Sequence, residues 1–273
     1  MILFNDISQT VLIILSIGLF ISTLEYLKKV QIFSPDGLLS WNVMQLKWTK
    51  QDQKSFLKPF FKLFSAPGLA GLFIIRCLLI IGLLFYPLQS TTGWILISLL
   101  GASLLLASLV TYYGSDGSDQ MSMLIIITLI LCNLPVLASG KLRDIGLWFI
   151  GLQACLSYAV AGIAKLVSSE WRSGTAIKDV FSTKTYGSKK ASLLLQKYPA
   201  ANRFLCWNVI IMESLFPLCL FLPWEFALIF LIWGFTFHFF TALIMGLNSF
   251  FWAFMATYPA IYFINHQMPW HLF

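Results

Sequence analysis

The chain has 273 residues, of which 59% are hydrophobic and only 11% are charged, and its formal net charge is +7. Soluble domains are about 25% charged, so this composition excludes an ordinary soluble protein and is typical of a polytopic membrane protein. The first apolar run has neither a positive leading region nor a cleavage site of small residues, so we expect it to remain as a membrane span.

Five cysteines lie singly within apolar runs, and none forms a C-x-x-C pair. Such cysteines usually behave as small hydrophobic side chains, which argues against a thiol–disulfide redox enzyme. No H-x-x-x-H spacing or Cys/His cluster occurs either, so we expect no metal site.

Eight apolar segments are long enough, or nearly so, to cross a bilayer, which takes about 20 helical residues. The last segment is short and contains Pro259, so seven spans plus a re-entrant piece is the alternative. We predict an all-α, polytopic transmembrane helical bundle of about eight spans that forms one domain over residues 1–273. The predicted spans are 8–27, 67–87, 92–113, 120–138, 144–166, 203–222, 225–246 and 248–265.

Loop charges predict the orientation of these spans. The loops 28–66 and 167–203 each contain seven lysines or arginines, whereas the opposite side has only Lys141 and Arg143. Positive loops stay in the cytoplasm, so we expect both basic loops there and both termini outside, in a multi-pass protein of the cell membrane. The basic residues accompany no base-reading motif, and nucleic acid is not an expected partner.

Two short helices are expected in these loops. Residues 55–68, SFLKPFFKLFSAPG, alternate bulky apolar residues with lysines, which suits an interfacial helix on the lipid surface; a hydrophobic linker is the alternative. Residues 188–199, SKKASLLLQKYP, predict a short helix that ends at Pro199. Trp171 is one of several tryptophans near predicted span ends, where an aromatic belt is expected.

Four ionisable residues stand inside the apolar runs: Arg76, Lys165, Glu213 and His238. A charge at bilayer depth costs several kcal/mol unless it is paired or faces a polar cavity, which makes such residues functional candidates. Counting along each span places Arg76, Glu213 and His238 near mid-depth, with Lys165 near the cytoplasmic side. Together with two aspartates before the fourth span, they can line one polar cavity that opens toward the cytoplasm. The six residues are Arg76, Asp116, Asp119, Lys165, Glu213 and His238.

Structural explanations compete with this interpretation. Arg76 can neutralise Glu213, since buried charges require partners. Lys165 can extend its ammonium group to the interface, and a single histidine on an aromatic-rich helix is often a packing residue. Alternatively, burial disfavours the charged ammonium, so a buried lysine can abstract a proton. A nearby histidine can then stabilise an oxyanion or relay the proton. Such a site suits a lipophilic substrate, for instance a quinol that enters from the bilayer.

The segment AGIAKLVSSEWRSGTAI, which contains Lys165 and Trp171, resembles the small-residue–Lys–Leu–x–x–x–Trp–x–x–Gly pattern of the HTTM (horizontally transferred transmembrane domain) family. Three further segments are similar to that family: FSPDGLLSWNV, YYGSDGSDQMSML and FHFFTALIMGLNSFFWAFM. The resemblance covers about residues 10–260. The best-known member is vitamin K-dependent gamma-carboxylase, and the small size of this chain is closer to the bacterial SdpB-type members.

The resemblance implies roles for individual residues. Lys165 would be the base that deprotonates a vitamin K-like quinol, His238 would belong to the same site, and Glu213 matches a family carboxylate in position. Where the family has a histidine just before the fourth span, this chain has Asp119 or Gln120. The residues alone fix no cofactor; the resemblance implies a quinone or quinol.

Three functions follow as hypotheses. The first is maturation or modification of a secreted peptide, with a partner maturation protein because no soluble substrate-binding domain accompanies the spans. The second is a glutamate carboxylase-like membrane enzyme that uses a quinol, oxygen and carbon dioxide. The third is a non-catalytic export, immunity or chaperone component whose buried charges only stabilise helix packing.

Overall fold

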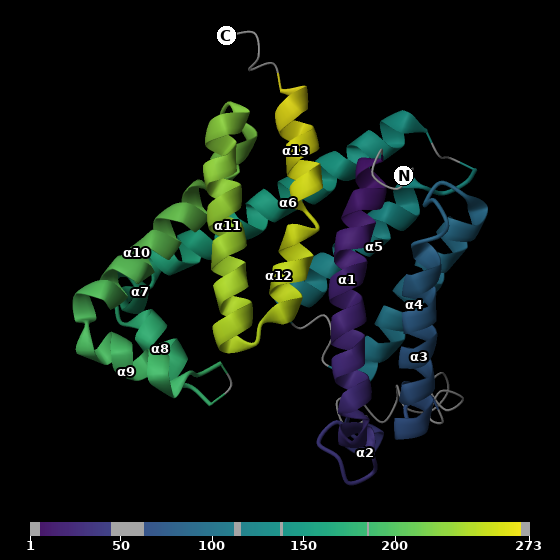
Figure 1. Cartoon of the computed structure of the whole chain (residues 1–273), viewed down its shortest axis with the longest axis horizontal. Coiled ribbons are helices and arrows are strands. Elements are labelled where there is room, and N and C mark those ends of the chain that lie inside the picture. The colour runs from purple at the N-terminus through teal and green to yellow at the C-terminus, as the bar shows by residue number, and fades with distance from the viewer. Residues whose placement is uncertain (1–5, 45–62, 112–115, 137–138, 185, 269–273) are drawn as a thin grey trace. The chain divides into compact units, whose positions relative to one another are not determined.

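The computed structural model describes residues 6–44, 63–111, 116–136, 139–184 and 186–268, and every regular element within these ranges is a helix (Figure 1). The expected all-α class is therefore confirmed for the part of the chain that is described. Six of the helices are long and apolar enough to cross a membrane, which identifies a multi-pass membrane protein. They are α1 (Ile7–Lys28), α3 (Ala66–Leu83), α4 (Thr91–Thr111), α6 (Gly140–Val167), α10 (Pro199–Leu215, continued by the 3-10 helix η5, Phe216–Leu220) and α11 (Trp224–Met245).

The two remaining predicted spans have a different form. The fourth is α5 (Gly117–Cys132), an apolar helix of 16 residues. The eighth is divided into α12 (Asn248–Met255) and α13 (Tyr258–Gln267), and Pro259 stands in the first turn of α13. Proline has no N–H to donate and is tolerated only at the start of a helix, so the chain ends one helix and begins another here.

The chain forms two compact units, Met1–Gly146 and Leu147–Phe273, and α6 begins in the first and ends in the second. The sequence predicts one domain over residues 1–273. That prediction concerns how the two units act together, and it stays a prediction. Of the two short loop helices that the sequence predicts, residues 55–62 of the first lie outside the described residues. The second is confirmed as α9 (Lys189–Lys197), which Ser188 caps through its hydroxyl.

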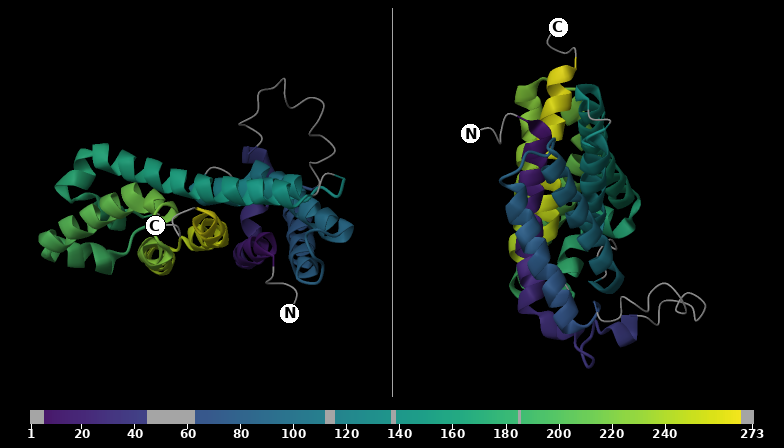
Figure 2. Two further views of the ribbon diagram at one scale, coloured as in Figure 1. Left: turned by 90° about the horizontal axis from the view of Figure 1, so that it is seen from above. Right: turned by 90° about the vertical axis from the view of Figure 1, so that its right-hand side faces the viewer.

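In the first unit, α3 packs against both α1 and α4 (Figure 2). Gln9 joins α1 to the turn after α3, because its side chain accepts a hydrogen bond from the Leu88 amide and donates one to the Leu83 carbonyl. Beyond the C-terminal end of α1, the 3-10 helix η1 (Val30–Phe33) and the short α2 (Trp41–Met44) contribute to an aromatic cluster. Within this cluster Tyr26 stacks on Phe73.

Arg76 lies in α3 and is almost fully buried. Its Nε donates to the Ser103 hydroxyl at 3.1 Å, and its Nη2 donates to the Ser103 carbonyl oxygen at 2.7 Å. Its guanidinium carbon also lies 5.2 Å from the centre of the Phe73 ring. A buried charge requires such compensation, and neutral groups on α3 and α4 supply part of it.

In the second unit, three short helices precede α10: α7 (Ser169–Ser173), α8 (Ala176–Ser182) and α9. Asn202 of α10 holds the turn between α7 and α8, because its amide donates to the Gly174 carbonyl and its oxygen accepts from the Lys178 amide. Gly174 has a φ of +85°, a conformation that glycine adopts without steric cost. The predicted polar loop 167–203 is thus folded, and its three short helices pack against α10.

Asn265 gives a test of the second unit. Its side-chain amide donates to the Cys219 carbonyl in η5 and to the Leu222 carbonyl just after it. Each buried polar group left without a partner costs about 1–3 kcal/mol, so Asn265→Ala should lower the unfolding temperature of the detergent-solubilised protein measurably. Gln267→Ala, an exposed change on the same helix, should leave it unchanged. Equal stability of the two variants would contradict this role.

Candidate functional site

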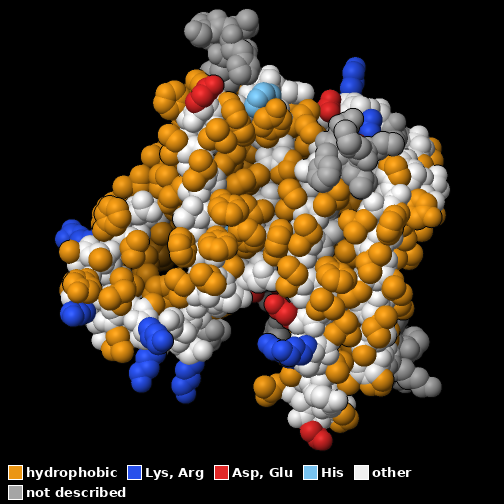
Figure 3. Space-filling view, viewed as in Figure 1, with side chains coloured by type: hydrophobic (Ala, Val, Ile, Leu, Met, Phe, Trp, Pro, Cys, Tyr) orange, Lys and Arg blue, Asp and Glu red, His pale blue; other side chains and the backbone are white. Residues whose placement is uncertain are grey.

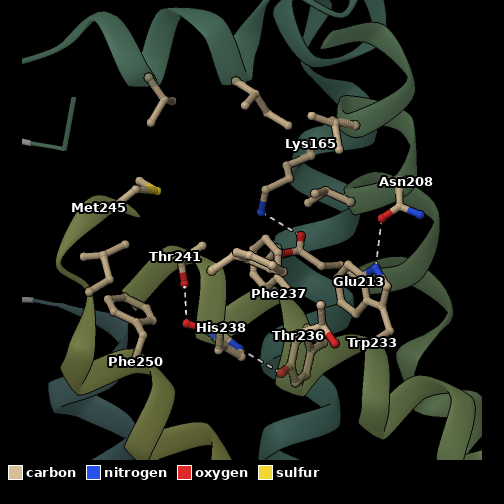
Figure 4. Close-up of a pocket in the computed structure, with 18 of the residues that line it drawn as sticks. Lys165, Asn208, Glu213, Trp233, Thr236, Phe237, His238, Thr241, Met245 and Phe250 are labelled. Atoms are coloured by element: carbon tan, nitrogen blue, oxygen red, sulfur yellow. Dashed lines mark hydrogen bonds and ion pairs between the residues drawn. The ribbon is translucent and has the colours of Figure 1, made fainter. Parts of the chain in front are cut away.

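A cavity of about 700 Å³ lies within the second unit, a size typical of small-molecule sites. Helices α6, α7, α8, α10, α11 and α12 supply its walls, which are predominantly apolar and aromatic (Figure 4). On the outer face, hydrophobic side chains cover α10 and α11, with a hollow between them (Figure 3). The cavity therefore favours a molecule that is itself mostly apolar.

Lys165 and Glu213 form an ion pair on the wall of this cavity, with 2.6 Å between Nζ and Oε2. Glu213 is buried, with 5% of its side chain exposed, whereas Lys165 retains 21%. The Lys165 ammonium also lies 5.2 Å from the centre of the Trp171 ring, a distance that permits a cation–π contact. The pair therefore has one buried acceptor and one ammonium that reaches the cavity.

Gly162 brings the two partners within reach of each other. It stands one turn before Lys165 on α6, and a Cβ atom there would collide with the backbone nitrogen and the hydroxyl of Ser214 on α10. Only glycine permits this approach of α6 to α10, which places Lys165 opposite Glu213. Gly162 of the AGIAK segment thus has a packing reason.

His238 projects from α11 into the same cavity and is buried. Its Nε2 lies 2.8 Å from the Tyr158 hydroxyl. Its ring stacks on Phe254, with 4.7 Å between centres and 17° between planes. Tyr158 in turn stacks on Phe216 at 3.8 Å. Aromatic packing on one side and a hydrogen bond on the other therefore hold the imidazole in place.

Most other polar groups of the cavity wall have partners within the wall itself. Trp233 donates from Nε1 to the Asn208 side-chain oxygen at 2.9 Å. The hydroxyls of Ser157, Thr236 and Thr241 each donate to a carbonyl of their own helix. Lys165, Glu213 and His238 are the ionisable groups of this wall with which a ligand can form polar contacts.

The residues singled out from sequence divide between the two units. Lys165, Glu213, His238 and Trp171 line the cavity. Arg76, Asp116 and Asp119 belong to the first unit, where the two aspartates lie at the start of α5. The recorded ion pair of Glu213 is with Lys165, and its expected pairing with Arg76 stays a prediction. Within the residues that the structure describes, no group of three or more His, Cys, Asp or Glu side chains could hold a metal ion.

Sequence reasoning missed Tyr158, Asn208 and Trp233 as wall residues. A signal for Tyr158 was present, since it precedes Lys165 by seven residues and two helical turns place both on one face. Asn208 and Trp233 carry no such signal, because their contact joins two helices. Comparison with known protein families, with characterised proteins and with solved structures finds no match.

Gly162→Ala tests the close approach of α6 to α10. The added methyl group must push the helices apart, and overpacking of this kind costs about 1–3 kcal/mol. The variant should unfold at a lower temperature than the wild-type protein. Gly71→Ala is a matched control, because a Cβ atom at Gly71 in α3 meets nothing within 4 Å; it should be neutral or slightly stabilising. Equal destabilisation by both changes would refute a specific role for Gly162.

Proposed function

We propose that the protein is an HTTM-type membrane protein that binds a lipid-soluble, hydroxyl-bearing molecule such as a quinol in the second-unit cavity. Lys165 and Glu213 would move a proton to or from that molecule during maturation or modification of a secreted peptide. The observation that carries the proposal is the 2.6 Å contact between Lys165 Nζ and Glu213 Oε2 on the wall of an otherwise apolar cavity.

Energetics support a role for this pair beyond packing. Replacing a buried ion pair by well-packed apolar residues is often neutral or stabilising, so packing alone gives little reason for a lysine and a glutamate here. The two groups share a hydrogen bond, so passage of the Lys165 proton to Glu213 Oε2 would move no net charge into the apolar cavity. The neutral Lys165 amine that this leaves would take a proton from a bound hydroxyl within its reach.

The cavity also suits the proposed substrate in shape. Apolar side chains of α8 and of the last turn of α11 line part of it, including Val180, Phe181 and Met245, whereas the polar pair lies on α6 and α10. A ligand with a polar head and an apolar tail would match this distribution. We place α8, which belongs to the loop 167–203, on the cytoplasmic side, where the ligand would meet a peptide before export with the help of a partner protein.

A second candidate function is non-catalytic. Lys165 already has a carboxylate and an aromatic ring as partners, an arrangement that would also suit a structural link between α6 and α10. In that case the protein would act as an export, immunity or chaperone component, and any cation able to pair with Glu213 would serve.

Substitution of Lys165 separates the two candidates. Lys165→Ala and Lys165→Arg should both abolish maturation, because arginine keeps the positive charge but does not release its proton. The measurement is mass spectrometry of the peptides secreted by cells that express each variant, with membrane-inserted protein quantified in parallel. Peptide masses unchanged from wild type in the arginine variant would favour the non-catalytic candidate.

The proposed orientation has its own test. A cysteine introduced at the exposed Lys184, in a background with Cys77 replaced by serine, should resist a membrane-impermeant maleimide in intact cells. It should react after the membrane is permeabilised, because a loop with seven basic residues stays in the cytoplasm. Labelling of intact cells would reverse the proposed topology.

A further inference from the structure

Helix α9 has an exposed side on which two leucines stand between lysines. Four of its residues follow the spacing i, i+3, i+4, i+7, which places them on one side of a helix, here named the α9 outer face. They are Lys190, Leu193, Leu194 and Lys197. Leu193 is 55% exposed and Leu194 57%. Ser192 and Leu195 point the other way and are buried, and α9 packs against α8 and α10 (Figure 1). The outer face is therefore both apolar and basic.

The chain around the α9 outer face carries positive charge alone. Residues 180–212 contain no aspartate or glutamate, and their basic residues are Lys184, Lys189, Lys190, Lys197 and Arg203. Blue side chains gather over α8 and α9 at the lower left of Figure 3. Lys178, on the preceding helix, pairs with Asp179 at 3.3 Å, whereas the three lysines of α9 have no recorded ion pair among the described residues. Their charge is therefore open to an anionic partner from outside.

The position of α9 along the chain puts its outer face beside the membrane. Only Tyr198 separates α9 from α10, which η5 continues into a segment long and apolar enough to cross a bilayer. Phe204, five residues into α10, is 69% exposed, as suits a side chain that faces lipid. Five helical residues rise about 7.5 Å, and each headgroup layer is about 5–8 Å thick. The α9 outer face thus stands at headgroup level.

We propose that the α9 outer face lies in the headgroup layer of the membrane and binds anionic phospholipids. Leu193 and Leu194 reach the upper acyl region, as the apolar side of an interfacial helix does. Lys189, Lys190 and Lys197 contact lipid phosphates, and each basic residue at an anionic surface strengthens the attraction about fivefold. An acidic protein would match the same charges, but the immediate entry of α10 into the bilayer favours lipid. This surface is separate from the cavity and from its proposed function.

Fluorescence quenching by brominated lipids tests both parts of the proposal. A bimane label on Leu194→Cys reports the lipid beside α9, in a Cys77→Ser background where the remaining cysteines are buried. The full chain is placed in nanodiscs of phosphatidylcholine and phosphatidylglycerol, with bromine on the acyl chains of one lipid at a time. Both lipids should quench, and phosphatidylglycerol should be preferred about fivefold or more. Ile229→Cys, exposed on α11, a helix without lysine or arginine, is the matched control and should show no preference.

Removal of charge separates anionic lipid binding from a general apolar contact. Glutamine at Lys189, Lys190 and Lys197 together should abolish the preference, while phosphatidylcholine still quenches because the leucines remain. About 0.5 M sodium chloride should lower the preference without these changes, which keeps the test valid if the triple variant fails to insert. No preference with all three lysines present, or a preference that survives their removal, would refute the proposal. A label quenched by neither lipid would also refute it, because water or a protein partner would then cover the face.

Discussion

The ion pair between Lys165 and Glu213 is the contact on which the organisation of the second unit depends. It joins the last turn of α6 to the last turn of α10, and it forms because Gly162 allows these helices to approach each other closely. Breaking a buried pair by removing one partner costs more than the pair contributes, since a charge is left without compensation. Both residues are therefore constrained by the same packing that places them on the cavity wall.

The rest of the cavity is arranged around a small number of available polar groups. Its hydroxyls, and the indole of Trp233, form hydrogen bonds within the wall, and aromatic rings hold His238 and Tyr158. A small number of polar atoms in an apolar cavity is typical of small-molecule sites, where a few polar groups fix the orientation of the ligand. The first unit offers a contrast, because Arg76 is held by the hydroxyl and carbonyl of one serine, Ser103.

The apolar runs made part of the fold predictable. The bilayer core has no water to bond with backbone N–H and C=O groups, so a spanning segment forms a helix, in which these groups bond to one another. Most helical segments match these runs closely. The prediction weakens at α5, which ends at Cys132 and has only 16 residues, and where Pro259 divides the last run. Lys165, Glu213 and His238 were found for a related reason, since ionisable side chains are conspicuous among apolar neighbours. That the three residues line one cavity depends on how α6, α10 and α11 pack.

What sequence could not supply is which helices face each other. Depth in the bilayer puts Arg76 and Glu213 at similar levels, yet Lys165 is the cation that lies on Glu213. The fold of residues 167–203 into a cap depends on Asn202 reaching back to the Gly174 turn, a contact between distant positions with no local pattern. Tyr158 was overlooked because a tyrosine in an aromatic-rich span does not stand out by composition, although its spacing from Lys165 was informative.

The central claim is that Lys165 acts as a proton-transferring group and not only as the cation that balances Glu213. A charge-swapped protein, Lys165→Glu with Glu213→Lys, tests it most directly. Its unfolding temperature should recover most of what each single variant loses, since the ion pair is restored in reverse. The mass spectrum of secreted peptides should nevertheless stay that of Lys165→Ala cells, because the amine now projects from α10. Recovery of both stability and peptide maturation in the swapped protein would contradict the account and leave the pair with a structural role alone.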